Sequence, residues 1–171
     1  MPKGNSGGKR NRGRFATAKR EGFGDYNKDN VPVYNGKIDY SGDFSNAKLK
    51  NLTDKEITNA IDKQAEMYRE ALNENLGDQR TRNGRMAKIF NTARKQQYEG
   101  SLTKLTQEAD RRNMPKYNIY NKKNNMLLVS AYTKTSATRN LAEMKRTDSA
   151  LQKQYNWSEL PEYVVRREKR K

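Results

Sequence analysis

The chain contains no cysteine and no histidine among its 171 residues. Structural zinc sites are built mainly from these two residue types, and a thiol nucleophile or an imidazole general base requires one of them. The sequence therefore excludes Cys/His zinc sites, thiol catalysis and any catalytic triad that depends on imidazole. We expect no metal ion and no cofactor, and we expect that the protein is not an enzyme.

Apolar residues are also scarce, at 32% of the chain, against about 45–50% in average globular proteins. The longest apolar run, residues 126–129, is far shorter than a bilayer span. The N-terminus is basic but lacks the apolar stretch of a secretory signal. These features predict a small core, no membrane association and a protein that is cytoplasmic or is associated with nucleic acid inside a host cell or particle.

Positive charge dominates the composition. Lysine and arginine number 36 against 20 acids, which gives a formal net charge of +16. An excess of this size favours polyanionic partners, above all DNA or RNA. A merely well-solvated surface would give the same composition, so the charge alone does not decide between the two interpretations.

The charge and glycine distribution predicts three regions. Residues 1–30 form a basic, glycine-rich flexible arm that cannot bury a core, residues 31–160 form a single domain, and residues 161–171 form a basic C-terminal tail. Flexible basic arms contact phosphates without a fold of their own. The candidate contacts in the arm are Lys9, Arg10, Arg12 and Arg14.

Helical periodicity is strongest in residues 53–76, where apolar residues recur on one arc and charges occupy the other. Thr53 and Glu56 have the spacing of a capping box, and Gly77 occupies the position of a left-handed C-cap.

Residues 31–40 carry the best hairpin signal, because Asn35-Gly36 suits a type I′ turn between two short strands. Pro32 cannot donate a ladder hydrogen bond, which predicts an edge strand. A second hairpin joins residues 117–120 to residues 126–132, whose apolar start predicts a central strand covered on both faces. We expect both hairpins to pair in one small antiparallel sheet.

Further helices follow from the same reasoning. The pattern predicts a helix from about Arg85 to Tyr98 that ends at Gly100, a short helix capped by Ser101, a helix from Ser136 to about residue 154, and a last short helix from Trp157. The predicted fold class is α+β, with three to five helices packed on one small antiparallel sheet and basic tails at both ends.

The helix that ends near Tyr98 carries our leading candidate interface. Met86, Ile89, Phe90 and Ala93 share one arc, and basic residues occupy the outer face. Lysine and arginine contacts to phosphate give affinity without sequence information. The predicted contacts are Arg80, Arg82, Arg85, Lys88, Arg94 and Lys95.

A second basic patch is predicted at the tip of the second hairpin, at Lys122 and Lys123. Tyr117, Tyr120 and Tyr132 flank it, and tyrosines beside bases either stack on single-stranded nucleic acid or pack at the rim of a core. No fragment of the sequence makes a persuasive active site.

These observations predict a non-enzymatic nucleic-acid-binding protein that contacts phosphates electrostatically. Four features favour an alternative, a viral or mobile-element assembly or inhibitor protein: the small size, the absence of catalytic chemistry, the Asn/Lys/Tyr-rich composition and the disorder-like N-terminus. Such a protein would dock its basic surface on an acidic protein groove or on packaged nucleic acid.

Overall fold

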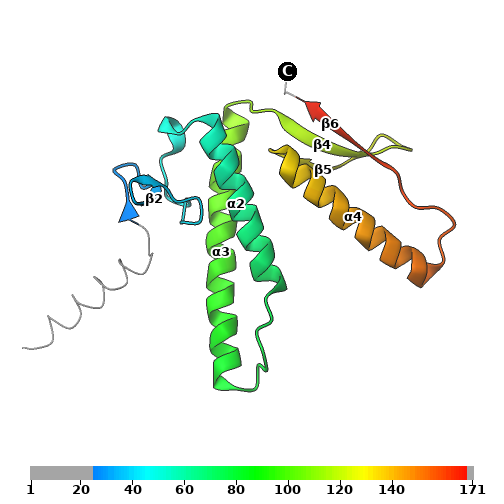
Figure 1. Cartoon of the computed structure of the whole chain (residues 1–171), viewed down its shortest axis with the longest axis horizontal. Coiled ribbons are helices and arrows are strands. Elements are labelled where there is room, and N and C mark those ends of the chain that lie inside the picture. The colour runs from blue at the N-terminus through cyan, green and yellow to red at the C-terminus, as the bar shows by residue number, and fades with distance from the viewer. Residues whose placement is uncertain (1–24, 169–171) are drawn as a thin grey trace, which may run out of the picture. The chain divides into compact units, whose positions relative to one another are not determined.

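The structure, a computed structural model, describes residues 25–168, and the predicted contacts Lys9, Arg10, Arg12 and Arg14 lie outside this range (Figure 1). The described part belongs to the α+β class, with three α-helices and two three-stranded antiparallel sheets. In chain order its elements are β1 (Asp25–Tyr26), β2 (Pro32–Tyr34), β3 (Lys37–Ile38), the 3-10 helix η1 (Leu49–Asn51), α2 (Asp54–Asn73), α3 (Arg82–Arg111), β4 (Lys116–Asn121), β5 (Leu127–Ala131), α4 (Lys134–Tyr155) and β6 (Tyr163–Glu168).

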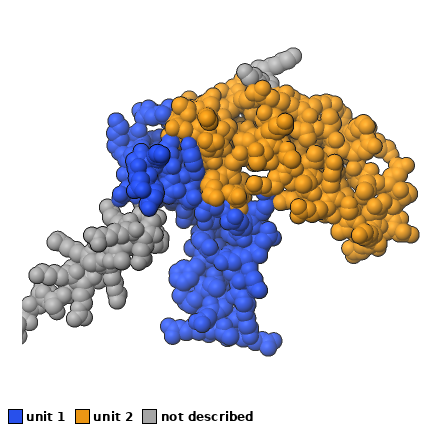
Figure 2. Space-filling model, viewed as in Figure 1, with its two compact units in different colours: residues 1–51, 67–104 blue, residues 52–66, 105–171 orange. Residues whose placement is uncertain are grey.

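The described residues fall into two compact units, shown in different colours in Figure 2, and the boundary between them crosses α2 and α3. Unit 1 contains residues 25–51 and 67–104, with the first sheet, the end of α2 and most of α3. Unit 2 contains residues 52–66 and 105–168, with the start of α2, the end of α3, α4 and the second sheet.

The first sheet, in unit 1, has the order β1-β2-β3. Asn35 and Gly36 connect β2 to β3 with φ angles of +48° and +74°, as the predicted turn requires. The prediction that Pro32 marks an edge strand is wrong, because β2 is central. Pro32 is tolerated there as the first residue of the strand, where its carbonyl accepts a hydrogen bond from Asp39.

Phe44 and Ser101 join the loops of unit 1 to α3. The backbone N–H of Phe44, which is fully buried, donates 2.9 Å to the Ser101 hydroxyl. The prediction that Gly100 ends one helix and Ser101 caps another is wrong, because α3 continues through both residues to Arg111. A Cβ at Gly100 would lie 3.3 Å from Cβ of Ser45. The small residues allow close packing on a continuous helix.

The start of α2 follows the prediction. Thr53 N–H donates 2.7 Å to Glu56 Oε2, and Glu56 N–H donates 3.2 Å to Thr53 Oγ1, which completes the capping box. Its end differs, because α2 stops at Asn73. Gly77 has a φ of +68° but belongs to the connection to α3 rather than to a helix cap.

The second sheet, in unit 2, has the order β5-β4-β6. The prediction of one sheet built from both hairpins is wrong, because each hairpin gains a third strand that the sequence did not reveal. β1 pairs with β2, and β6 pairs with β4. The predicted central strand, β5, is an edge strand, and Leu127 is 49% exposed on it.

β6 replaces the short helix predicted from Trp157, within the range predicted as a basic tail. Pro161 disfavours the helical conformation of the residue before it, and Val164 and Val165 are β-branched. Residues 163–168 consequently pair along the whole of β4.

α4 covers one face of the second sheet. Ile119 on β4 and Ala137 on α4 are buried, and the Tyr163 hydroxyl donates to Asp148 of α4. The N-cap of α4 is Thr133 rather than the predicted Ser136, and it accepts 3.1 Å from the Ser136 N–H. Asn156, in the left-handed conformation, ends the helix.

Candidate nucleic-acid interface

The turn before α3 presents the first basic residues of the predicted interface. Asp78 accepts 2.8 Å from the N–H of Arg80, and Thr81 Oγ1 accepts 3.0 Å from the N–H of Gly84, as an N-cap hydroxyl does. Gly84 is required there, because a Cβ would lie 1.9 Å from the Asp78 carbonyl oxygen. This tight turn fixes the backbone from which Arg80 and Arg82 extend.

Between Asp78 and Glu99 the chain carries six bases and no acid. The structure brings all six predicted contacts of this segment to the first half of α3 and the turn before it, in unit 1. Five of the six are exposed, and Lys95 is half-buried. One side of the helix carries Arg82, Arg85 and Lys88 at three-residue spacing, which separates successive side chains by about 4.5 Å along the axis.

Not all six bases are equally available to a ligand. Arg94 pairs with Glu74, and this pairing, together with a bond from Asn91, lowers the pKa of the Glu74 carboxyl. Arg85 donates 2.7 Å to the carbonyl oxygen of Arg80. Within residues 25–168, the side chains of Arg80, Arg82, Lys88 and Lys95 make no ion pair.

The arc of α3 that packs in unit 1 is not the apolar one. Asn91 and Tyr98 are buried, at 1% and 7% exposure. The arc with the larger apolar side chains faces solvent instead, and its exposed members are Met86 (42%), Ile89 (59%) and Phe90 (60%). Bases and apolar side chains therefore share the outer surface of this part of α3.

The predicted hairpin tip belongs to unit 2 and joins β4 to β5. Lys122 forms an ion pair of 2.6 Å with Glu162, and this contact raises the pKa of the lysine. Lys123 is exposed and makes no ion pair with any residue the structure describes. Of the two predicted tip lysines, Lys122 thus has an acidic partner, and Lys123 has none within residues 25–168.

The three tyrosines beside the tip do not form one stacking surface. Tyr117 and Tyr120 lie on opposite faces of β4 because they are three residues apart, and each ring has an arginine of β6 over it. The Arg167 guanidinium lies 6.0 Å from the Tyr117 ring, and that of Arg166 lies 5.0 Å from the Tyr120 ring. Tyr132 donates its hydroxyl to Asp110.

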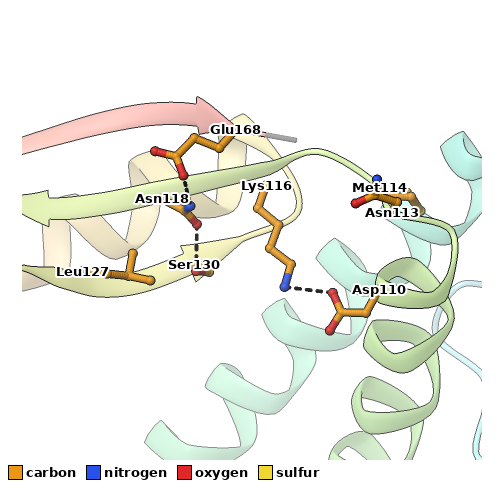
Figure 3. Close-up of a pocket in the computed structure, with 8 residues that line it drawn as sticks. All are labelled: Asp110, Asn113, Met114, Lys116, Asn118, Leu127, Ser130 and Glu168. Atoms are coloured by element: carbon orange, nitrogen blue, oxygen red, sulfur yellow. Dashed lines mark hydrogen bonds and ion pairs between the residues drawn. The ribbon is translucent and has the colours of Figure 1, made fainter. Parts of the chain in front are cut away.

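The sheet face opposite α4 carries a polar cluster that the sequence did not reveal. Asn118 accepts 2.7 Å from Ser130 and donates 2.9 Å to Glu168, which also accepts 2.9 Å from the Tyr120 hydroxyl. Figure 3 shows Asn118, Ser130 and Glu168, which come from three adjacent strands, beside Lys116, which pairs with Asp110 at 2.8 Å. The alternation of side chains along β4 could have placed Asn118 on this face from the sequence alone. Glu168 could not have been placed there, because the sequence did not reveal that its segment forms the strand β6.

This cluster borders a cavity of about 210 Å³. The cavity is lined by Asp110, Asn113, Met114, Lys116, Asn118, Leu127, Ser130 and Glu168. Its polar groups bond to one another: both ends of the Asn118 amide are occupied, and Lys116 is neutralised by Asp110. The arrangement stabilises the sheet and leaves few donors directed at a ligand.

No group of three or more acidic side chains in residues 25–168 is arranged to hold a metal ion. No helix in this range combines the length and the apolarity that crossing a bilayer demands. Comparison of the chain with protein-family models, with curated proteins and with solved structures gave no match.

Proposed function

We propose that the protein binds nucleic acid without catalysing a reaction, and that the first half of α3 contacts phosphates. The observation that supports this function is the exposed basic segment between Asp78 and Glu99, which contains no acid. Bases held on a rigid helix keep their spacing, so several phosphates are neutralised without the cost of ordering a loop.

The free bases give the proposal a quantitative form. Arg80, Arg82 and Lys88 have no acidic partner within the described residues, and each phosphate that they neutralise releases condensed counterions. Binding to duplex DNA should weaken with a log–log salt slope of about −0.9 for each phosphate contact. Three contacts therefore contribute a slope of about −2.7, and other bases of the chain add to it.

Fluorescence anisotropy of labelled 20-nucleotide duplex DNA, single-stranded DNA and RNA, measured between 50 and 300 mM salt, tests this proposal. The variant R80A/R82A/K88A should weaken binding and make the duplex slope shallower by about 2.7. Its matched control is K145A/R146A/K153A, which removes the same charge from exposed positions of α4.

The control should retain most of the affinity. Equal losses in the two variants would show that net charge alone drives binding, and α3 would then not be the interface. A salt-independent affinity, or no binding at 50 mM salt, would remove nucleic-acid binding as the function. The three probes also distinguish DNA from RNA and single strands from duplex.

A further inference from the structure

The solvent-facing arc of α3 is apolar at its centre and basic along its edge. Met86, Ile89 and Phe90 project from the side opposite Asn91, and all three are more than 40% exposed. Single exposed apolar side chains are common, whereas three on adjacent helical turns make a contiguous patch. Phosphate binding does not explain this patch, because phosphates offer no apolar surface.

We infer that this arc docks an acidic amphipathic helix of a partner protein. Such a helix would place its apolar stripe on Met86, Ile89 and Phe90 and its carboxylates beside Arg85 and Lys88. Helix recognition of this kind uses apolar anchors at i, i+3, i+4 and i+7. The arc from residue 86 to residue 93 offers that spacing over about 10 Å.

Charge complementarity selects this occupant over two others. A second copy of the chain would bring the same base-rich, acid-free segment against itself, with like charges facing each other. Residues 1–24 of the chain carry seven bases and one acid, so they are repelled from this arc as well. An acidic helix satisfies both the charge and the apolar surface.

The small size of the arc predicts weak and reversible binding, since interfaces well below about 1,200 Å² belong to transient complexes. The probe is a designed 16-residue helical peptide with leucines at i, i+3, i+4 and i+7 and glutamates on both flanks. A peptide of identical composition in scrambled order has the same charge but no apolar stripe. We expect the designed peptide to bind the full chain at least tenfold more tightly than the scrambled one.

The variant I89S/F90S separates this proposal from nucleic-acid binding, because it removes apolar surface and no charge. It should lower the affinity for the designed peptide at least tenfold and leave the affinity for DNA or RNA unchanged. Its matched control is M126S/L127S, which removes two exposed apolar side chains from unit 2 and should change neither. Circular dichroism and the melting temperature should be unaltered in both variants, since the substituted side chains are exposed.

Several results would overturn the proposal. Equal binding of the designed and scrambled peptides would show attraction by charge alone. Binding to phosphatidylserine vesicles that I89S/F90S abolishes, without binding of the peptide, would identify the arc as a lipid-contact surface. Sedimentation of the wild type as a dimer that I89S/F90S dissociates would identify the occupant as a second copy.

Discussion

The side-chain amide of Asn91 donates 2.8 Å to the carbonyl oxygen of Ala71, near the C-terminal end of α2. The last four carbonyls of a helix have no partner within it, and Asn91 supplies one. The same amide donates 2.6 Å to Glu74. A buried polar residue thus holds α3 against the end of α2, and this contact turns Met86, Ile89 and Phe90 toward solvent.

Replacing Asn91 with alanine should destabilise unit 1. The substitution leaves the Ala71 carbonyl without its donor in a buried position, which costs about 1–3 kcal/mol. Urea denaturation followed by circular dichroism measures the loss. Asn83→Ala is the matched control, because Asn83 is exposed in the first turn of α3. This substitution should change the free energy of unfolding by no more than about 0.5 kcal/mol. Equal stability of the two variants would show that the Asn91 bonds contribute nothing.

Asn91 also explains why the sequence alone does not predict which face of α3 is exposed. A helical wheel ranks arcs by hydrophobicity, so it groups Met86, Ile89 and Phe90 and assigns no role to Asn91. Burial depends on partners as well as on polarity, and the partner of Asn91 is a backbone carbonyl twenty positions earlier. No periodicity in the sequence records such a contact.

Other elements show the same division between local and non-local information. The capping box of α2 and the Asn35-Gly36 turn were predictable because their interactions span two or three residues. β6 was not, because its partner β4 lies more than forty residues away and three of its six residues are charged. The exposed bases of α3 can be read from the sequence, whereas the pairing of Arg94 with Glu74 required the structure.

Gly84→Ala should destabilise the start of α3, although alanine is the better helix former by about 1 kcal/mol. The new Cβ would lie 1.9 Å from the Asp78 carbonyl oxygen, so the backbone of the turn must move. We expect a net loss of about 1–3 kcal/mol in urea denaturation.

The same displacement should weaken nucleic-acid binding, because it moves Arg80 and Arg82. Ala87→Gly supplies the comparison, since it lowers helix propensity without a steric clash. If Gly84→Ala proved more stable than the wild type, the close approach to Asp78 would be refuted.

Asp62 anchors the first turn of α4 within unit 2. Its carboxylate accepts hydrogen bonds from the hydroxyls of Thr133 and Ser136. Asp62→Ala leaves two half-buried hydroxyls without this acceptor and should cost about 1–3 kcal/mol. Asp62→Asn retains one acceptor oxygen and should cost less.

Hydrogen exchange of the amides in residues 134–140 provides a local measurement. Exchange should accelerate in Asp62→Ala, because the start of α4 frays more readily. Unchanged exchange in both variants would contradict an anchoring role.

Glu108 makes part of the stability of unit 2 dependent on pH. The Arg111 guanidinium, assisted by that of Arg112, lowers the pKa of the Glu108 carboxyl from 4.5 to about 2. A depressed pKa in the folded state means that the stabilisation is complete above the unfolded value of 4.5 and is lost as the pH falls toward 2. Arg112 also donates 2.6 Å to the Leu52 carbonyl, so the cluster joins the end of α3 to the segment before α2.

Chemical denaturation of wild type and Glu108→Gln between pH 6 and pH 2 measures this contribution. The wild type should be more stable at pH 6 by about 1–2 kcal/mol, a range reduced for solvent screening because Arg111 is two-thirds exposed. The difference should shrink as the pH falls below 4.5 and nearly vanish by pH 2. Glu159→Gln, at an exposed position, should show no such convergence. A constant difference between wild type and Glu108→Gln across the whole range would mean that the glutamate acts through packing and not through its charge.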